Sequence, residues 1–159
     1  MALLIELETA KKIYDYQPRW FQEHLEKAFE KGCFKKINFK DFKTFEDLCQ
    51  ATGTTEEEFN KKWDPAIFDP STIAFERMKI CTRAYNQDWK YNLYDTTQKK
   101  WAPIFEVLSS GLGFSYSDCD YDYTLTCVGS RLCFADESRS DHAGKTFPIL
   151  FLNLNNAKY

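Results

Sequence analysis

The apolar residues change their spacing near Trp89, and this change restricts the folds open to the chain. Before Trp89 the apolar side chains recur three or four residues apart, as on the buried face of an amphipathic helix. After it come short aromatic runs, typical of strands and hairpins, that are separated by Asp95, Pro103, Gly111 and Gly113. We therefore predict an α+β protein, with N-terminal helices followed by a small antiparallel β meander and a C-terminal helix.

Local signals place the first two helices. Residues 1–10 suit either a strand or a helix, and we expect a short extended lead into a helix near Thr9. Pro18 suits the first position of a second helix, because a backbone N–H has no helical partner there. Gly32 supplies the C-terminal stop of this second helix.

Two short helices are predicted within residues 44–63. Each begins with a capping box, in which a threonine and an acidic residue three positions later cap the first turn. The two pairs are Thr44 with Asp47 and Thr55 with Glu58. Gly53 ends the first of these helices, and the two prolines within residues 64–70 exclude a continuous helix after the second.

A longer helix is predicted from Ser71, which can cap its N-terminus. Its apolar stripe has helical spacing and consists of Ala74, Met78, Cys81, Tyr85 and Trp89. Near the C-terminus, residues 132–134 suit a last strand, and residues 136–154 return to helical spacing. Pro148 must kink or restart this final helix.

The length of 159 residues and the hydrophobic content of 43% fit one compact domain over residues 1–159. We expect its helical part at about 1–90, its β-rich part at about 91–135 and its C-terminal helix at about 136–155. No stretch approaches the roughly 18 to 20 apolar residues of a membrane span, and the N-terminal residues lack the basic start of a signal peptide. We therefore expect no membrane partner and a cytoplasmic location, in the host cytoplasm if a phage encodes the chain.

Charge and cysteine content limit the classes of partner. The 21 basic and 24 acidic residues give a net charge of −3, and the chain has no basic run, so we do not expect duplex nucleic acid as a partner. The six cysteines form no Cys-x-x-Cys pair, and Cys49 and Cys81 fall in apolar stripes. We predict buried free thiols, with no metal site and no cofactor.

Four segments carry a resemblance to known sequences. They are Lys-Thr-Phe-Glu-Asp-Leu-Cys at 43–49, Ile-Ala-Phe-Glu-Arg-Met-Lys-Ile at 73–80, Val-Gly-Ser-Arg-Leu-Cys-Phe at 128–134 and Ala-Gly-Lys-Thr-Phe at 143–147. Together they resemble a family of small uncharacterised proteins of gut-bacterial genomes, prophages and other mobile elements, over about residues 40–155. The last helix departs from the family pattern at residues 139–142 and at Pro148. The resemblance implies an accessory protein of a phage or mobile element, and it supplies no catalytic residues.

Four residues near the C-terminus indicate a phosphate site. Gly129, Ser130 and Arg131 precede the last predicted strand, and Lys145 lies near the start of the last predicted helix. The free backbone amides of a helix start attract anions. The alternative is a tight turn that needs its glycine, with Arg131 paired to an aspartate of the preceding acidic segment.

Residues 115–123 alternate between two kinds of side chain. As a strand they place three aspartates on one face and a cysteine with two tyrosines on the other, namely Asp118, Asp120 and Asp122 against Cys119, Tyr121 and Tyr123. The three carboxylates raise the hypothesis of a Ca²⁺ site. Because the glycine and glutamate of an EF-hand loop are not in register here, we expect a solvated hairpin instead.

Aromatic residues make up 17% of the chain, and many of them lie in the predicted β part. We expect one exposed aromatic patch there, suited to stacking on a base or to a protein interface. The residues that we select as ligand-binding candidates are Trp101, Tyr116, Tyr121 and Tyr123.

These observations favour a non-catalytic protein that binds a small anionic ligand such as a nucleotide, in order to counter host defence signalling. The alternatives are a protein-interaction or particle-associated module with a host protein as partner, and a hydrolase that acts through Asp118, Asp120 or His142. No enzyme signature is present in the sequence, so no catalytic residue is assigned. A homo-oligomer is expected only by analogy with small binding proteins that build pockets across a two-fold interface.

Overall fold

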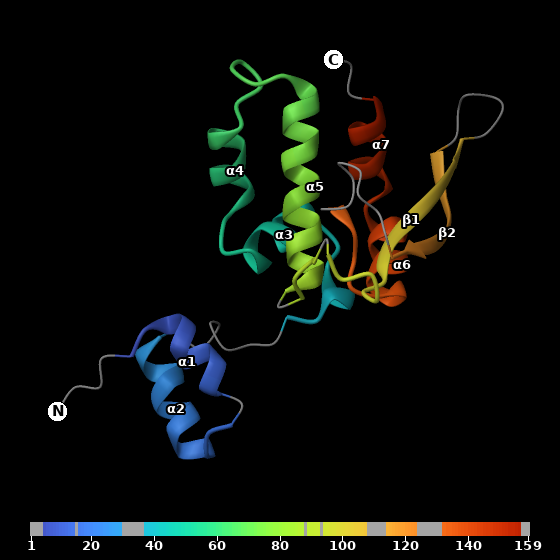
Figure 1. The fold of residues 1–159 in the computed structure, drawn as a ribbon. Helices are drawn as coiled ribbons and strands as arrows, with labels where there is room; N and C mark the ends of the chain where they lie inside the picture. Colours follow the sequence, from blue (N-terminus) through green and yellow to red (C-terminus); the bar gives the residue numbers. More distant parts are fainter. Residues whose placement is uncertain are drawn as a thin grey trace. The chain divides into compact units, whose positions relative to one another are not determined.

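The computed structural model describes residues 5–14, 16–29, 37–87, 89–92, 94–107, 114–123 and 132–156. The chain divides into two compact units, residues 1–37 and residues 38–159, and each unit is considered by itself. The single domain expected over residues 1–159 stays a prediction. Helices precede a β-hairpin and further helices follow it, so the predicted α+β class is confirmed (Figure 1).

The described part of the first unit includes two short helices, α1 (Leu7–Tyr14) and α2 (Arg19–Ala28). The hydroxyl of Tyr14 donates a hydrogen bond to the Glu26 carboxylate. The side-chain amide of Gln22 donates to the carbonyl oxygen of Tyr14 at 2.9 Å. These two bonds join α1 to α2 across their connecting turn.

The sequence signals for this unit are close to the observed boundaries. The first helix begins at Leu7, slightly before the expected start near Thr9. Pro18 is the N-cap of α2 and not its first residue, which is a shift by one position. The stop expected at Gly32 lies outside the described residues.

The second unit begins with a 3₁₀ helix (Phe39–Asp41), which is followed by α3 (Phe45–Ala51) and α4 (Glu56–Lys62). Both predicted capping boxes are present. They are formed by Thr44 with Asp47 and by Thr55 with Glu58. In each box the threonine hydroxyl accepts a hydrogen bond from the backbone N–H of the acidic residue. The acidic side chain in turn accepts one from the backbone N–H of the threonine. Gly53 follows α3 with φ of 79°, a left-handed conformation that favours glycine.

The longest helix, α5 (Pro70–Asn86), begins with a different cap from the one expected. The predicted N-cap at Ser71 is wrong, because Asp69 is the N-cap and its carboxylate accepts from the Thr72 N–H at 2.9 Å. Pro70 occupies the first helical position, where its fixed φ fits. Most of the predicted apolar stripe is buried as expected, namely Ala74, Met78, Cys81 and Tyr85.

The β part consists of one antiparallel hairpin, β1 (Lys100–Val107) with β2 (Phe114–Asp122). The third strand expected at 132–134 is reduced to a single bridge. The N–H of Trp101 donates to the Phe134 carbonyl oxygen at 3.1 Å, and the N–H of Phe134 donates back to Trp101 at 2.8 Å. In the part of the chain that the structure describes, the sheet therefore has two strands and one bridging residue.

The hairpin contains a bulge that changes which side chains share a face. Ile104 pairs with Asp118, but the next residue of β1, Phe105, pairs with Tyr116. Ser117 is thus the extra residue on β2, and the alternation of the strand shifts there by one position. Tyr116 consequently shares the half-buried side of β2 with Cys119 and not with Asp118.

The final helical segment is split into α6 (Glu137–Thr146) and α7 (Pro148–Asn156), so the restart predicted at Pro148 is confirmed. In α6, Gly144 lies against the hairpin. A methyl group at this position would lie 2.4 Å from Cδ2 of Tyr116 and 2.8 Å from Cβ of Pro103. Glycine at 144 is therefore required by the close approach of helix and strands.

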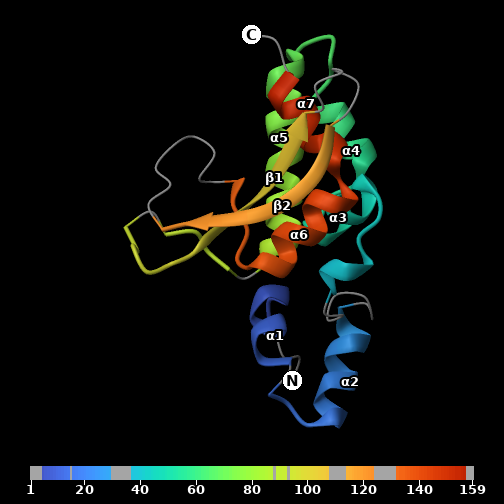
Figure 2. The same ribbon diagram turned by 90° about the vertical axis from the view of Figure 1, so that its right-hand side faces the viewer.

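The core of the second unit surrounds α5, which lies between α3 and α4 on one side and α7 with the hairpin on the other (Figures 1 and 2). At its centre is Tyr85, which is 0% exposed. Four rings from three other parts of the chain surround Tyr85 within 6.3 Å between centroids, namely Phe39, Phe42, Phe134 and Phe147. This cluster joins the N-terminal and C-terminal segments of the unit.

Two polar side chains hold the irregular segments beside the hairpin. The amide of Asn86 donates to the Cys133 carbonyl oxygen at 2.8 Å, and its oxygen accepts from the Ala135 N–H at 2.9 Å. The ammonium of Lys100 is 0% exposed and donates to three backbone carbonyl oxygens within 3.1 Å, those of Asp95, Gln98 and Tyr123. A buried charge needs this degree of hydrogen bonding to be tolerated.

Three of the four described thiols are buried and free as predicted. Cys49, Cys81 and Cys133 are buried and free, and Cys119 is half-buried and free. Burial raises the pKa of the Cys49 thiol to about 11 and that of the Cys133 thiol to about 11. Buried thiols in such surroundings remain protonated and act as small apolar side chains. Cys33 and Cys127 lie outside the described residues.

Candidate functional site

Three of the predicted ligand-binding residues lie together at one end of the hairpin. The ring centroids of Trp101 and Tyr121 are 4.7 Å apart, and those of Tyr121 and Tyr123 are 5.5 Å apart. The ammonium of Lys99 lies 4.2 Å from the Tyr121 centroid. Tyr121 and Tyr123 are each 38% exposed, so this aromatic cluster of Lys99, Trp101, Tyr121 and Tyr123 reaches the surface.

Two more of the predicted residues, Tyr116 and Lys145, contact a carboxylate of the chain itself. The hydroxyl of Tyr116 donates to Oδ1 of Asp141 at 2.7 Å, and Nζ of Lys145 lies 2.7 Å from the same oxygen. The Lys145 and Tyr116 bonds lower the pKa of Asp141. Lys145 lies in the last turn of α6, so the prediction that it is near the start of a helix is wrong. Its cationic charge is also already paired, and this group is less suited to an external anion than the sequence indicated.

The other predicted sites are placed as follows. Gly129, Ser130 and Arg131 lie outside the described residues, so the phosphate site proposed for them stays a prediction. The carboxylates of Asp118 and Asp120 are exposed and accept from the backbone N–H groups of Cys119 and Tyr121. Across the described ranges, no group of three histidine, cysteine or acidic side chains is arranged to hold a metal ion.

His142, the candidate for hydrolysis, is part of the core wall. Its Nδ1 lies 2.7 Å from the Tyr85 hydroxyl and 3.4 Å from Oγ1 of Thr146. Burial lowers the pKa of His142, although the charge of Asp141 opposes this shift. Burial also raises the pKa of Tyr85, so its hydroxyl keeps its proton and can donate to a neutral imidazole. These contacts give His142 a structural role between α5 and α6.

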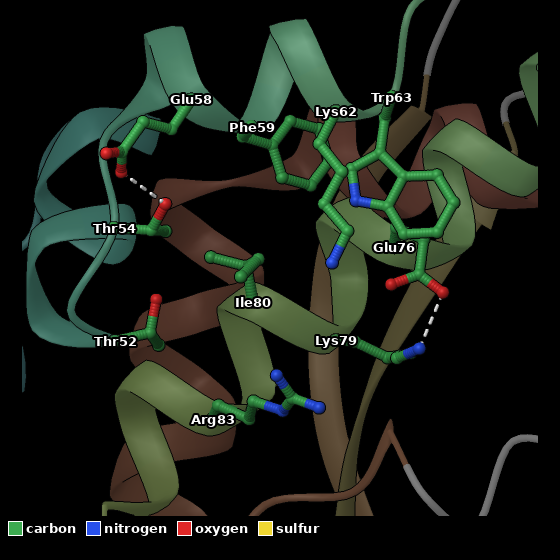
Figure 3. A pocket seen from close by; sticks show the side chains of 10 residues that line it. All are labelled: Thr52, Thr54, Glu58, Phe59, Lys62, Trp63, Glu76, Lys79, Ile80 and Arg83. Carbon is green, nitrogen blue, oxygen red and sulfur yellow. Dashed lines mark hydrogen bonds and ion pairs between the residues drawn. The ribbon is translucent and has the colours of Figure 1, made fainter. Parts of the chain in front are cut away.

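A pocket of about 370 Å³ opens between α4 and α5 (Figure 3). The end of α3 and the α3–α4 connection complete its wall. Trp63, at the C-cap of α4, and Ile80 of α5 supply apolar surface. Two acidic and three basic side chains also line it, so its net charge is positive by one.

The cations of this pocket differ in how far they are neutralised. Nζ of Lys79 lies 2.5 Å from a carboxylate oxygen of Glu76. Nζ of Lys62 lies 5.4 Å from the centroid of the Trp63 ring. Within the part of the chain that the structure describes, neither Lys62 nor Arg83 forms an ion pair with a carboxylate. Two positive charges are thus left for an anion.

The remaining acid of the pocket is already bound by the chain. The hydroxyl of Thr54 donates to a Glu58 carboxylate oxygen at 2.9 Å, and the N–H of Thr55 donates to it at 3.0 Å. These bonds, that of Thr54 first, lower the pKa of Glu58 and keep it ionised. Figure 3 shows the Glu58 carboxylate turned toward Thr54 at one end of the pocket, away from Arg83.

This pocket was not among the sites predicted from the sequence. A local signal existed on α5, because Glu76, Ile80 and Arg83 have the spacing of one helical stripe. The other half of the wall comes from Lys62 and Trp63 on α4. Their position opposite α5 depends on how the two helices pack, and no local pattern predicts that.

Comparison of the chain with protein-family models, with curated proteins and with solved structures finds no match. Among the helices that the structure describes, none combines the length and the apolar character needed to cross a membrane.

Proposed function

We propose that this chain is a non-catalytic binding protein for a small organic anion, which it holds in the pocket between α4 and α5. The observation that supports this proposal most strongly is the pair Lys62 and Arg83. In Figure 3 both cationic groups are turned toward the space between the helices. Neither has a carboxylate partner among the residues described.

The chemistry of the wall favours a ligand that combines a phosphate or carboxylate with a planar ring. A guanidinium binds such anions through two parallel hydrogen bonds, and an indole ring supplies a stacking surface. The hydroxyls of Thr52 and Thr54 already donate within the chain, so we assign the anion to the cationic donors Lys62 and Arg83. The volume of about 370 Å³ lies in the range of small-ligand pockets. A nucleotide meets all of these requirements.

Calorimetric titration with adenosine and guanosine mono- and triphosphates tests the proposal. Lys62→Gln and Arg83→Gln should each raise the Kd at least about tenfold, because a hydrogen bond to a charged group contributes about 1.5–3 kcal/mol. Lys61→Gln is the matched control, since it removes the same charge from the same helix outside the pocket. Absence of binding to every nucleotide at millimolar concentration, or an equal loss in Lys61→Gln, contradicts the proposal.

The biological setting follows from the resemblance to proteins of mobile elements. We infer that the ligand is a nucleotide of host defence signalling, which the chain removes from solution by binding it. Native mass spectrometry of protein purified from a bacterial host tests this role, followed by denaturation and identification of released molecules. A released nucleotide supports it. A ligand-free protein in cells with active nucleotide signalling contradicts it.

A second candidate function rests on the aromatic cluster of the hairpin. In this cluster two exposed tyrosines lie beside a half-buried tryptophan and a lysine. Aromatic side chains of this kind are enriched among the central residues of protein interfaces. If a host protein binds there, Tyr121→Ser with Tyr123→Ser should abolish its co-purification. Tyr94→Ser is the control, because Tyr94 is also exposed and lies outside the cluster. Equal recovery with both variants rules out this surface.

A further inference from the structure

Among the residues that the structure describes, strand β2 pairs with one strand, β1, and the side chains along its length include several exposed ones. In Figure 1 β2 is the outermost strand, and in Figure 2 it lies nearest the viewer with no described element drawn over it. Ser117, Asp118, Asp120 and Tyr121 are exposed along it. The outer edge of such a strand presents backbone donors and acceptors that can pair with a strand of another molecule.

The hydrogen bonds of Trp101 identify which groups of β2 point outward. Trp101 exchanges both of its backbone hydrogen bonds with Phe134, on the side of β1 away from β2. Its partner in the hairpin, Tyr121, is therefore in a non-hydrogen-bonded pair, and the Tyr121 N–H and carbonyl point to the outer edge.

The same conclusion holds two residues along the strand. Cys119 pairs with Pro103, and proline has no N–H to donate. The alternation of an antiparallel ladder also makes this a non-hydrogen-bonded pair. The N–H of Cys119 therefore points to the outer edge, as the N–H of Tyr121 does.

The side chains of the two preceding aspartates occupy both of these donors. The N–H of Cys119 donates to Oδ1 of Asp118 at 2.8 Å, and the N–H of Tyr121 donates to Oδ1 of Asp120 at 2.7 Å. An incoming strand would have to displace both carboxylates before it could pair. If that strand were β2 of a second copy, like charges would also be brought together.

We propose that Asp118 and Asp120 close the outer edge of β2 against pairing with β2 of a second copy of this chain. The two carboxylates occupy the donors that an antiparallel, two-fold related strand would use. This inference is independent of the proposed function, because none of its residues lines the pocket between α4 and α5.

The test compares two double variants with equal charge. Asp118→Ala with Asp120→Ala removes the caps, whereas Asp118→Asn with Asp120→Asn removes the same charge but retains an acceptor oxygen. Sedimentation velocity over a concentration series should show the alanine variant at twice the wild-type mass. The asparagine variant should keep the wild-type mass. Equal association of the two variants, or none in the alanine variant, overturns the proposal.

Amide hydrogen exchange in the single variants gives a second readout that needs no association. At low concentration, Asp118→Ala should speed exchange at Cys119 at least tenfold and leave Tyr121 unchanged, and Asp120→Ala should do the reverse. Each asparagine variant should exchange as the wild type does. Wild-type exchange rates in both alanine variants overturn the proposal.

Discussion

The hydroxyl of Tyr85 lies 2.7 Å from Nδ1 of His142, 57 residues further along the chain. Tyr85 belongs to α5 and His142 to α6, so this contact joins the central helix to the C-terminal segment. The ring of Phe39 lies 5.8 Å from the imidazole centroid and covers it from a third segment. The pair is thus a polar contact inside an aromatic core. We therefore expect protonation of His142 to affect the stability of the fold.

We predict that acidification below pH 6.5 destabilises the second unit through His142. Burial lowers the pKa of His142 from its ordinary value of 6.5, while Asp141 and a hydrogen bond to the Lys40 backbone oppose the shift. Below pH 6.5 the unfolded chain binds a proton that the folded chain does not. The free energy of unfolding therefore falls with pH from 6.5 down to the folded-state pKa.

Urea denaturation at pH 7 and at pH 5 measures this effect. His142→Gln should lose less stability between the two pH values than the wild type, because glutamine has no proton to gain. His24→Gln, which removes the other histidine of the chain, is the control and should behave as the wild type does. The same pH dependence in wild type and His142→Gln would exclude His142 as the cause.

Gly144→Ala should destabilise the second unit. The added methyl group would lie 2.4 Å from Tyr116 and 2.8 Å from Pro103, so helix and hairpin must move apart. Overpacking of this kind costs about 1–3 kcal/mol. Ser138→Ala, on an exposed position of the same helix, is the control for the change in helix propensity. Equal urea midpoints for the two variants would show that the contact is easily relieved.

Lys100→Met should destabilise the second unit more strongly than Lys99→Met. The methionine leaves three backbone carbonyl oxygens without the ammonium that binds them. Loss of hydrogen bonds to a charged group costs about 1.5–3 kcal/mol. Lys99 is exposed, and its contact with Tyr121 contributes about 0.5–1 kcal/mol. The free energies of unfolding of the two variants decide the order.

Asp69→Ala should lower the midpoint of unfolding more than Ser71→Ala does. Asp69 accepts from the Thr72 N–H and hydroxyl and from the Ser71 hydroxyl, so its removal leaves the first turn of α5 without a cap. The Ser71 and Thr72 bonds hold the pKa of Asp69 well below its ordinary value of 3.8. This contribution is therefore present above pH 3.8 and is lost as the pH falls below it. A larger effect of Ser71→Ala would show that Ser71, and not Asp69, caps the helix.

The helices could be predicted from the sequence because their signals are local. The capping boxes at Thr44 and Thr55 and the break at Pro148 each act within one turn. The cap of α5 was misassigned because Asp69 and Ser71 flank Pro70 and both residue types cap helices. The pairing of Lys145 with Asp141 could also have been read from their i,i+4 spacing.

The hairpin and the candidate site depend on contacts between distant segments. The bulge at Ser117 moves Tyr116 to the face of Cys119. Simple alternation of side chains along β2 does not predict this bulge. The position of Phe134 depends on its bridge to Trp101. It also depends on the bond from the Asn86 side chain to the carbonyl oxygen of the neighbouring Cys133, which is 47 residues further along the chain. The pocket exists only where α4 packs beside α5. Lys62 and Arg83 are therefore brought to one site by helix packing, which their positions in the sequence do not predict.

Nuclear magnetic resonance titration shows where on the protein a nucleotide binds. With adenosine monophosphate added to ¹⁵N-labelled protein, the Trp63 indole N–H and the Arg83 Nε–H resonances should shift and saturate. The Trp101 indole resonance, in the aromatic cluster of the hairpin, should stay in place. Shifts at Trp101 with none at Trp63 and Arg83, here or with any other nucleotide tested, would contradict the assignment of the anion site to the pocket between α4 and α5.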